Sequence, residues 1–188
     1  GASAAGEYEI EQSLRFNTAD IASLSRTPSV AGNRKTWTYS LWFKRGNLGN
    51  TRLFAAGTSG EANHDNMTYA YIASDKFQAI AEGSGTFDLR TTQLFRDCSA
   101  WYHIIFAVDT TQATASDRIK VYSNGVQITD FTTETYPALN SESYFNATNP
   151  HYIGRGVGTP DTYDGYLSEV NFIDGLALTP DSFGETGD

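Results

Sequence analysis

The sequence predicts an all-β domain built as a sandwich or a barrel. Its 188 residues include 11 Tyr, 11 Phe, 3 Trp and 17 Gly but one Met, a bias toward residues that favour strands and turns. Apolar residues recur at alternate positions, which indicates strands with one buried face, and helical periodicity is almost absent. Turn residues separate these segments about every ten residues, as is typical of sandwiches and barrels.

The first long strand is predicted at residues 36–44. Trp37, Tyr39, Leu41 and Phe43 alternate along it. Because successive side chains of a strand point to opposite faces, these four residues share one face, which we expect to be buried.

The later strands are separated by turns of recognisable chemistry. Asn124-Gly125 supplies the positive φ angles of a tight type I′ hairpin turn. A second turn is expected at Ser74-Asp75, and one helical turn after Thr179-Pro180, where proline suits a first helical position. Further strands are predicted at residues 52–56, 67–73, 76–82, 87–95, 101–108, 118–123, 126–131, 151–154 and 163–173.

The length suits one domain. We assign residues 11–183 to it. The small residues at 1–10 are expected to be a linker or a cloning remnant, and the polar residues at 184–188 a tail. Both ends indicate a domain taken from a longer chain.

Charge and cysteine content exclude several classes of protein. The formal net charge is −9, which disfavours binding to nucleic-acid phosphates. No apolar run is long enough for a membrane span. Cys98 is the single cysteine, which excludes an intrachain disulfide and a cysteine-based zinc site.

Two stretches of the chain carry a family resemblance. Residues 101–109 and 119–125 combine a Trp-Tyr-His strand with a hairpin reading VYSNG, and residues 152–155, 163–170 and 176–180 resemble the closing strands and turn of the same family. Together they resemble laminin G-like domains of the concanavalin A-like lectin/glucanase superfamily. The opening segments, residues 13–16 and 24–28, resemble the first strands of these domains. The sequence as a whole is similar to laminin G-like domains of phage tail and virion proteins.

The resemblance implies a two-sheet antiparallel jelly-roll β-sandwich. It also implies a non-catalytic module that binds a carbohydrate or a cell-surface receptor, as part of a larger phage tail or virion protein at an extracellular or virion surface. Other virion subunits and further copies of the chain are its other expected partners. The alternatives are a structural, decoration or oligomerisation module without a small ligand and, third, a glycoside hydrolase.

The hydrolase alternative depends on the segment from Glu169 to Asp174. Laminarinase-type members of the superfamily carry a Glu-x-Asp-x-x-Glu strand, and retaining hydrolysis needs two carboxyl groups about 5 Å apart. Here Asn171 occupies the middle position and the shorter Asp174 the last. We therefore expect no catalytic residues and no enzyme.

No metal or other cofactor is expected, although calcium remains an alternative. The three histidines lack the spacing of a shared zinc site. Calcium would need clustered oxygen ligands. Asp161 with Asp164, and Glu61 with Asp65, are the loop carboxylates that come closest to this, but turns favour Asp for backbone reasons.

The candidate ligand site lies in the glycine-rich loop from Gly154 to Gly165. Sugars are bound by aromatic faces with charged and amide side chains around them. Tyr163, with Arg155, Asp161 and Asp164, offers that combination. Other loop residues of suitable type are Tyr136, Tyr144, Phe145, Asn140, Asn146 and Asn149.

Overall fold

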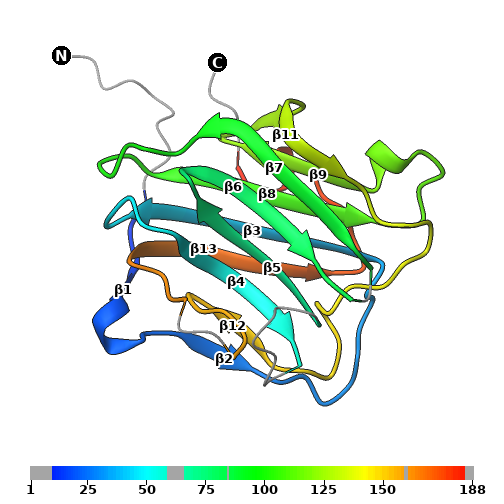
Figure 1. Ribbon diagram of the computed structural model, residues 1–188, viewed down its shortest axis with the longest axis horizontal. Helices are drawn as coiled ribbons and strands as arrows, with labels where there is room; N and C mark the ends of the chain where they lie inside the picture. Colours follow the sequence, from blue (N-terminus) through cyan, green and yellow to red (C-terminus); the bar gives the residue numbers. More distant parts are fainter. Residues whose placement is uncertain (1–9, 59–65, 84, 159–160, 185–188) are drawn as a thin grey trace.

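The chain folds as two antiparallel β-sheets packed face to face (Figure 1). This computed structural model describes residues 10–58, 66–83, 85–158 and 161–184. The predicted two-sheet sandwich is therefore confirmed. The expected linker at residues 1–10 and the tail at 184–188 fall almost wholly outside the described residues.

Within the described residues, one sheet has six strands in the order β1-β13-β3-β8-β9-β10. Its central strand, β3, pairs with β13 on one side and with β8 on the other. The strands of this sheet are β1 (Leu14–Phe16), β13 (Gly165–Asp174), β3 (Thr36–Arg45), β8 (Tyr102–Asp109), β9 (Ile119–Ser123) and β10 (Val126–Ile128).

The facing sheet has seven strands over the same described ranges, in the order β11-β7-β6-β5-β4-β12-β2. Its β2 and β12 form the edge that lies opposite the β1 side of the six-stranded sheet (Figure 1). The strands are β11 (Phe131–Thr135), β7 (Phe87–Leu94), β6 (Lys76–Ala81), β5 (Met67–Ala73), β4 (Thr51–Gly57), β12 (His151–Ile153) and β2 (Leu24–Arg26).

The core follows from the alternation along β3. Trp37, Tyr39, Leu41 and Phe43 all face the second sheet and are buried, as predicted. The Tyr39 ring stacks on Phe54 of the facing sheet with 3.8 Å between ring centroids. Large aromatic side chains from both layers thus interdigitate at the centre of the sandwich.

The two predicted tight turns are confirmed. Asn124 and Gly125 have φ angles of 47° and 82°, and Ser74 and Asp75 have φ angles of 49° and 63°. Two successive positive φ angles match the right-handed twist of the flanking strands, so each turn joins adjacent strands directly.

One predicted strand is wrong. Residues 126–131 were expected to be continuous, but the chain breaks between β10 and β11, which belong to different sheets. The carbonyl of Asp130 accepts hydrogen bonds from the backbone N–H and the hydroxyl of Thr92 on β7. This pairing carries the chain across to the second layer, and alternation alone carries no information about which sheet a residue joins.

The C-terminal segment covers the outer face of the six-stranded sheet. The Thr38 hydroxyl donates to the carbonyl of Leu176 at 2.7 Å and accepts from the N–H of Leu178 at 2.8 Å. The predicted helical turn is a 3₁₀ turn, η3 (Pro180–Ser182), and Phe183 then packs on this face. Two further 3₁₀ turns are η1 (Thr18–Asp20) and η2 (Ala115–Asp117).

Arg45 closes one end of the sandwich from the inside. Its side chain is fully buried, and it donates to the Asp75 carboxylate at 2.9 Å, to the carbonyl of Phe95 at 2.7 Å and to the carbonyl of Gly49 at 2.9 Å. The guanidinium therefore ties two turns and the end of β7 to the central strand.

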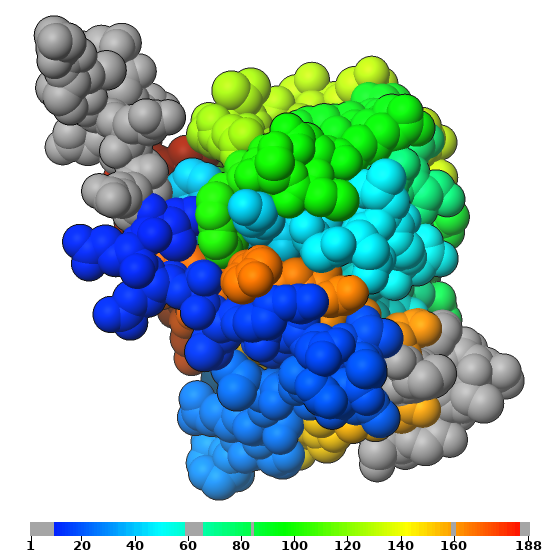
Figure 2. Space-filling model, turned by 90° about the vertical axis from the view of Figure 1, so that its left-hand side faces the viewer, coloured from blue at the N-terminus to red at the C-terminus, as the bar shows by residue number. Residues whose placement is uncertain are grey.

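The sandwich is open along one edge. The short β1 pairs with residues 165–167 of β13, and no described strand continues it beside residues 171–174. Figure 2 shows this side, where the blue N-terminal segment lies beside the orange stretch that joins β12 to β13. The described residues contain no helix long and apolar enough to cross a membrane.

Trp37→Ala should lower the free energy of unfolding by about 3–5 kcal/mol. Trp37 has no exposed surface, and its indole N–H donates to the Ser143 hydroxyl at 3.1 Å. Urea unfolding followed by circular dichroism measures the loss, with Val126→Ala, 70% exposed in the parent, as the control. A Trp37 variant as stable as the control would contradict the assigned inner face of β3.

Asp75→Asn should destabilise the protein at pH 7 by about 1.5–3 kcal/mol, the range for a hydrogen bond to a charged group. Hydrogen bonds from Arg45 and Arg96 hold the pKa of Asp75 below its ordinary value of 3.8. The carboxylate therefore stabilises the fold above pH 3.8, and this contribution is lost as pH falls through the lowered pKa. Asparagine tolerates the positive φ of this turn.

The measurement is urea unfolding of parent and variant at pH 7 and in steps below pH 4. The gap between them should narrow in acid. Asp130→Asn, an exposed carboxylate between two strands, serves as the control. A gap that is constant with pH would show that the Asp75 charge does not stabilise the fold.

Candidate functional site

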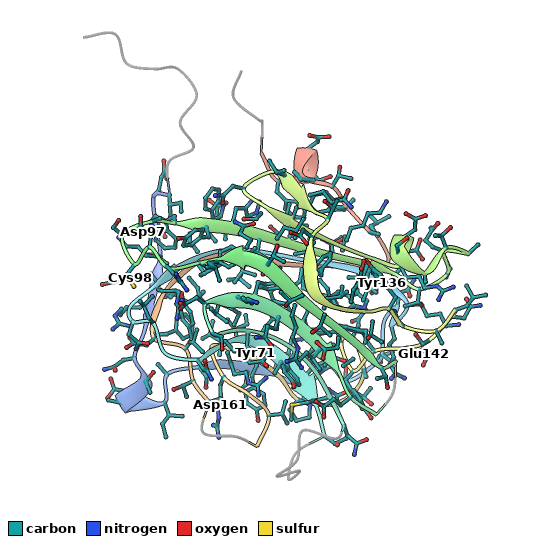
Figure 3. The ribbon with its side chains drawn as sticks, turned by 45° about the horizontal axis from the view of Figure 1, so that its top comes forward. Tyr71, Asp97, Cys98, Tyr136, Glu142 and Asp161 are labelled. Atoms are coloured by element: carbon teal, nitrogen blue, oxygen red, sulfur yellow. The ribbon has the colours of Figure 1, made fainter. Side chains whose placement is uncertain are left out.

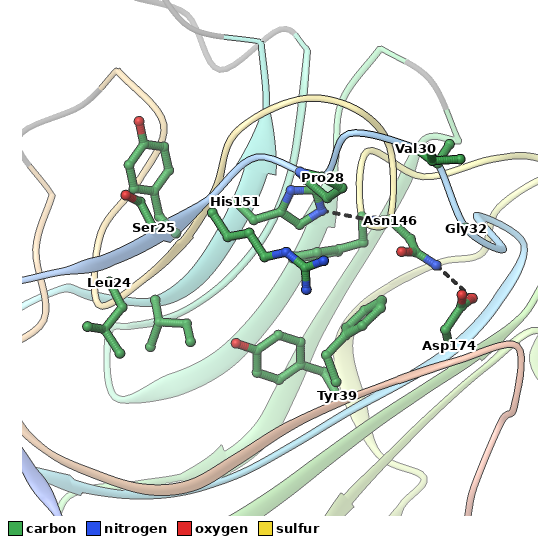
Figure 4. A pocket seen from close by; sticks show the side chains of 15 residues that line it. Leu24, Ser25, Pro28, Val30, Gly32, Tyr39, Asn146, His151 and Asp174 are labelled. Carbon is green, nitrogen blue, oxygen red and sulfur yellow. Dashed lines mark hydrogen bonds between the residues drawn. The ribbon is translucent and has the colours of Figure 1, made fainter.

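A pocket of about 560 Å³ lies at the open edge, between the two sheets (Figure 4). It is lined by β2 and β12 on one side, by β3 and the end of β13 on the other, and by the connection from β2 to β3. Its volume is within the range of sites for small ligands, roughly 300–1,000 Å³. The pocket is therefore large enough to hold a small ligand.

Three aromatic rings form the inner wall of the pocket. The ring centroid of Tyr39 lies 6.0 Å from that of Phe145 and 6.0 Å from that of Phe172, and Phe145 and Phe172 are 6.3 Å apart. Phe172 is 37% exposed because no described strand covers this part of β13. Part of the aromatic core is thus open to solvent and able to contact a ligand.

The Tyr39 hydroxyl points into this pocket (Figure 4). It makes no hydrogen bond to another described residue. Burial raises the pKa of Tyr39, so the hydroxyl stays protonated and can donate a hydrogen bond to a ligand.

His151 holds the opposite wall in place. Its Nε2 accepts the backbone N–H of Asn146 at 2.9 Å, and its Nδ1 lies 2.8 Å from the carbonyl of Asn149. An accepting Nε2 requires the proton to be on Nδ1, so the ring is neutral and both nitrogens are engaged. Burial, with a smaller effect of Arg26, lowers the pKa of His151.

The far end of the pocket is an amide–carboxylate pair. Asp174 Oδ1 accepts from the Asn146 side chain at 2.6 Å and from the backbone N–H of Asn33 at 2.8 Å. Gly32 allows the β2–β3 connection to lie directly against Asn146, because a Cβ at this position would clash with the Asn146 side-chain amide nitrogen. The glycine thus lets the β2–β3 connection dock onto the end of β13.

The structure corrects the predicted role of Tyr163. Its side chain has no exposed surface, its hydroxyl donates to the carbonyl of Lys44 at 2.7 Å, and its ring packs edge-on against Phe16. A ring enclosed in this way has no face to offer a ligand. Tyr163 is a core residue, although the glycine-rich and polar residues around it in the sequence are typical of an exposed loop.

The other three predicted residues do not form one cluster. The Arg155 guanidinium lies 5.7 Å from the Tyr152 ring centroid. Asp161 pairs with Arg52 at 3.2 Å on the outer face of the seven-stranded sheet, near Tyr71 (Figure 3).

Asp164 lies elsewhere, near the start of β13, bound to Arg15 at 2.6 Å and to Asn47 at 2.7 Å. Asp161 and Asp164 thus have separate partners, and no group of three His, Cys, Asp or Glu side chains suited to a metal occurs among the described residues. Glu61 and Asp65 lie outside those residues.

Sequence reasoning missed most of the pocket. It included Phe145 and Asn146 among suitable loop residues, but it assigned Tyr39 to the core and Phe172 to an ordinary strand. It had no role for Arg26. No local sequence pattern indicates that part of β13 lacks a neighbouring strand. The exposure of Phe172 could therefore not be predicted from the sequence.

The two carboxylates of the hydrolase-like segment line different hollows of the open edge. Asp174 lines the pocket described above, whereas Glu169 lines a smaller hollow beside β1. A bulge between Ser168 and Asn171, with Glu169 at φ 47°, interrupts the alternation here. The segment therefore lacks the regular one-face spacing of the laminarinase-type strand.

Comparison with known proteins places the chain in a family. A laminin G family model described as the concanavalin A-like lectin/glucanases superfamily matches residues 17–182. A search of curated proteins finds no match.

Solved structures share the fold at low sequence identity. Mouse laminin α1 chain domains LG4-5 align with a TM-score of 0.61 and 11% identity over 96% of this chain and 46% of that chain. The CBM40 of Ruminococcus gnavus IT-sialidase gives 0.59 and 13% over 86% and 96%. A heptameric SAP-like pentraxin from Limulus polyphemus gives 0.58 and 20% over 82% and 70%. The chain belongs to the concanavalin A-like lectin/glucanases superfamily.

Proposed function

We propose that the chain is a non-catalytic carbohydrate-binding module and that its sugar site is the pocket at the open edge. The observation that carries the proposal is the combination of an open aromatic wall with polar groups at its rim. A sugar ring has apolar faces that stack on aromatic rings, and hydroxyls that need hydrogen-bond partners. The exposed ring of Phe172 supplies the first, and the Tyr39 hydroxyl and Asp174 supply the second.

The structural neighbours support this proposal. The R. gnavus CBM40 was also solved bound to α2,3-sialyllactose, and that complex aligns with a TM-score of 0.52 and 11% identity. Asn171 at the middle position of the segment from Glu169 to Asp174 argues against hydrolysis, because an amide cannot replace an acidic group there. A binding role uses the rigid sandwich as a scaffold and leaves ligand chemistry to its rim.

The module works best in several copies. A shallow sugar site binds weakly on its own, and repeated display raises the overall avidity by orders of magnitude. A virion or tail fibre that attaches to a glycan-bearing cell surface would carry many copies of the module. The resemblance of the sequence to laminin G-like domains of phage proteins agrees with this role. We propose that the module acts at an extracellular or virion surface, within a larger protein.

A second candidate function is a structural contact with other subunits. Leu14, Ile21 and Leu24 are 56%, 52% and 48% exposed along the β1 and β2 edge. Exposed apolar side chains that gather in one region mark interaction surfaces. Light scattering separates the two functions: a stable oligomer with no glycan binding would favour the structural role.

Phe172→Ala should weaken glycan binding about three- to tenfold, because it removes the most accessible ring of the pocket wall. A glycan array with the parent chain identifies ligands, and titration calorimetry with the best one compares the variants. Tyr166→Ala is the matched control. Tyr166 lies on the same strand and is 39% exposed, but it does not line the pocket.

The control variant should bind as tightly as the parent. Absence of binding to any glycan on the array would reject the carbohydrate proposal. Equal losses in both variants would instead place the sugar outside the pocket.

A further inference from the structure

The pocket contains a cation without a matching anion. Arg26 lines it, and it forms no ion pair with any carboxylate in the described ranges. It lies across from His151 in the pairing of β2 with β12. Arg26 is exposed, so its guanidinium is available to a ligand that enters the pocket.

The neighbouring groups do not neutralise this cation. The His151 ring is neutral and both of its nitrogens are already engaged. The pocket carboxylate, Asp174, lies at the opposite side from Leu24 and Ser25 (Figure 4), held by Asn146 and Asn33.

A further donor is the Tyr39 hydroxyl, which points toward the part of the pocket lined by Leu24 and Ser25 (Figure 4). The pocket therefore offers a guanidinium and a phenolic hydroxyl, both of which donate hydrogen bonds. It also offers a carboxylate and an amide, which suit the hydroxyl groups of a sugar.

We propose that the glycan bound in this pocket carries a carboxylate, as the sugars of the sialic and uronic acid classes do. This inference rests on the proposed carbohydrate-binding function. The sugar carboxylate pairs with Arg26, whose planar fork matches it in two parallel hydrogen bonds, and the Tyr39 hydroxyl donates to the same group. The ring lies against Phe172, and its hydroxyls reach Asp174.

Local pairing has to provide this preference because the chain as a whole is acidic. A net charge of −9 repels an anionic ligand at long range. A neutral sugar of the same shape would make no charge-assisted hydrogen bond with Arg26, so the pair is a source of selectivity as well as affinity.

Titration calorimetry with matched probes tests the inference on the whole chain. The acidic probes are 3′-sialyllactose and trigalacturonate. Their neutral counterparts are lactose and the methyl ester of trigalacturonate. The parent should bind each acidic probe about tenfold more tightly than its counterpart, the effect of one good charge-assisted pair.

Arg26→Gln should reduce the ratio of acidic to neutral affinity from about tenfold to within about twofold. Arg26 is exposed and without an ion pair to the described residues, so the variant should fold as the parent does. Arg26→Lys keeps the charge but not the planar fork, so it should retain part of the preference. Lys76→Gln changes the net charge equally on β6, away from the pocket, and should leave the preference unchanged.

Equal affinity of the parent for acidic and neutral probes would overturn the acidic preference while carbohydrate binding stands. A preference that survives in Arg26→Gln would overturn the role of Arg26. Binding of decanoate in the absence of binding to any sugar would overturn both proposals, because the pocket would then serve an apolar carboxylate.

Discussion

Aromatic packing between the two sheets is the constraint on which the rest of this structure depends. Trp37 and Tyr39 of β3 meet Phe54 of the facing sheet and Phe106 of β8 in a continuous cluster, with the Tyr39 and Phe54 rings in parallel contact. Interiors packed at this density leave little freedom in the separation of the layers. The position of the Tyr39 ring, and so the floor of the pocket, is determined by the core itself.

The pocket exists because one layer is incomplete at its edge. Sheet edges expose unpaired backbone groups and are usually shortened, bulged or covered. Here β1 is short, β13 carries a bulge, and the connection from β2 to β3 folds over the gap through Gly32. Because this edge is only partly covered, Phe172 stays partly exposed. An apolar residue of the sandwich can therefore contact a ligand without any change in fold.

Two arginines show how the same side chain serves stability in one place and recognition in another. Arg45 is enclosed, and a carboxylate and two carbonyls accept its hydrogen bonds. Arg26 lies on an edge strand with no such acceptor among the described residues. A buried charge must be satisfied within the fold, whereas a charge at a pocket rim can be satisfied by a ligand. Family membership alone would not distinguish them, because function belongs to the site and not to the fold.

The sequence by itself determined the all-β class, the inner face of β3 and the turns at Ser74-Asp75 and Asn124-Gly125, because alternation and backbone φ preferences act over a few residues. Only the tertiary structure decided that residues 126–131 divide between the two sheets, that Tyr163 is enclosed and that Arg26, Tyr39 and Phe172 meet around one pocket. These outcomes depend on which distant strands become neighbours and where a strand lacks one. No short stretch of sequence encodes that, because pairing between segments 100 or more residues apart, as between β1 and β13, is settled by the packing of the whole sandwich.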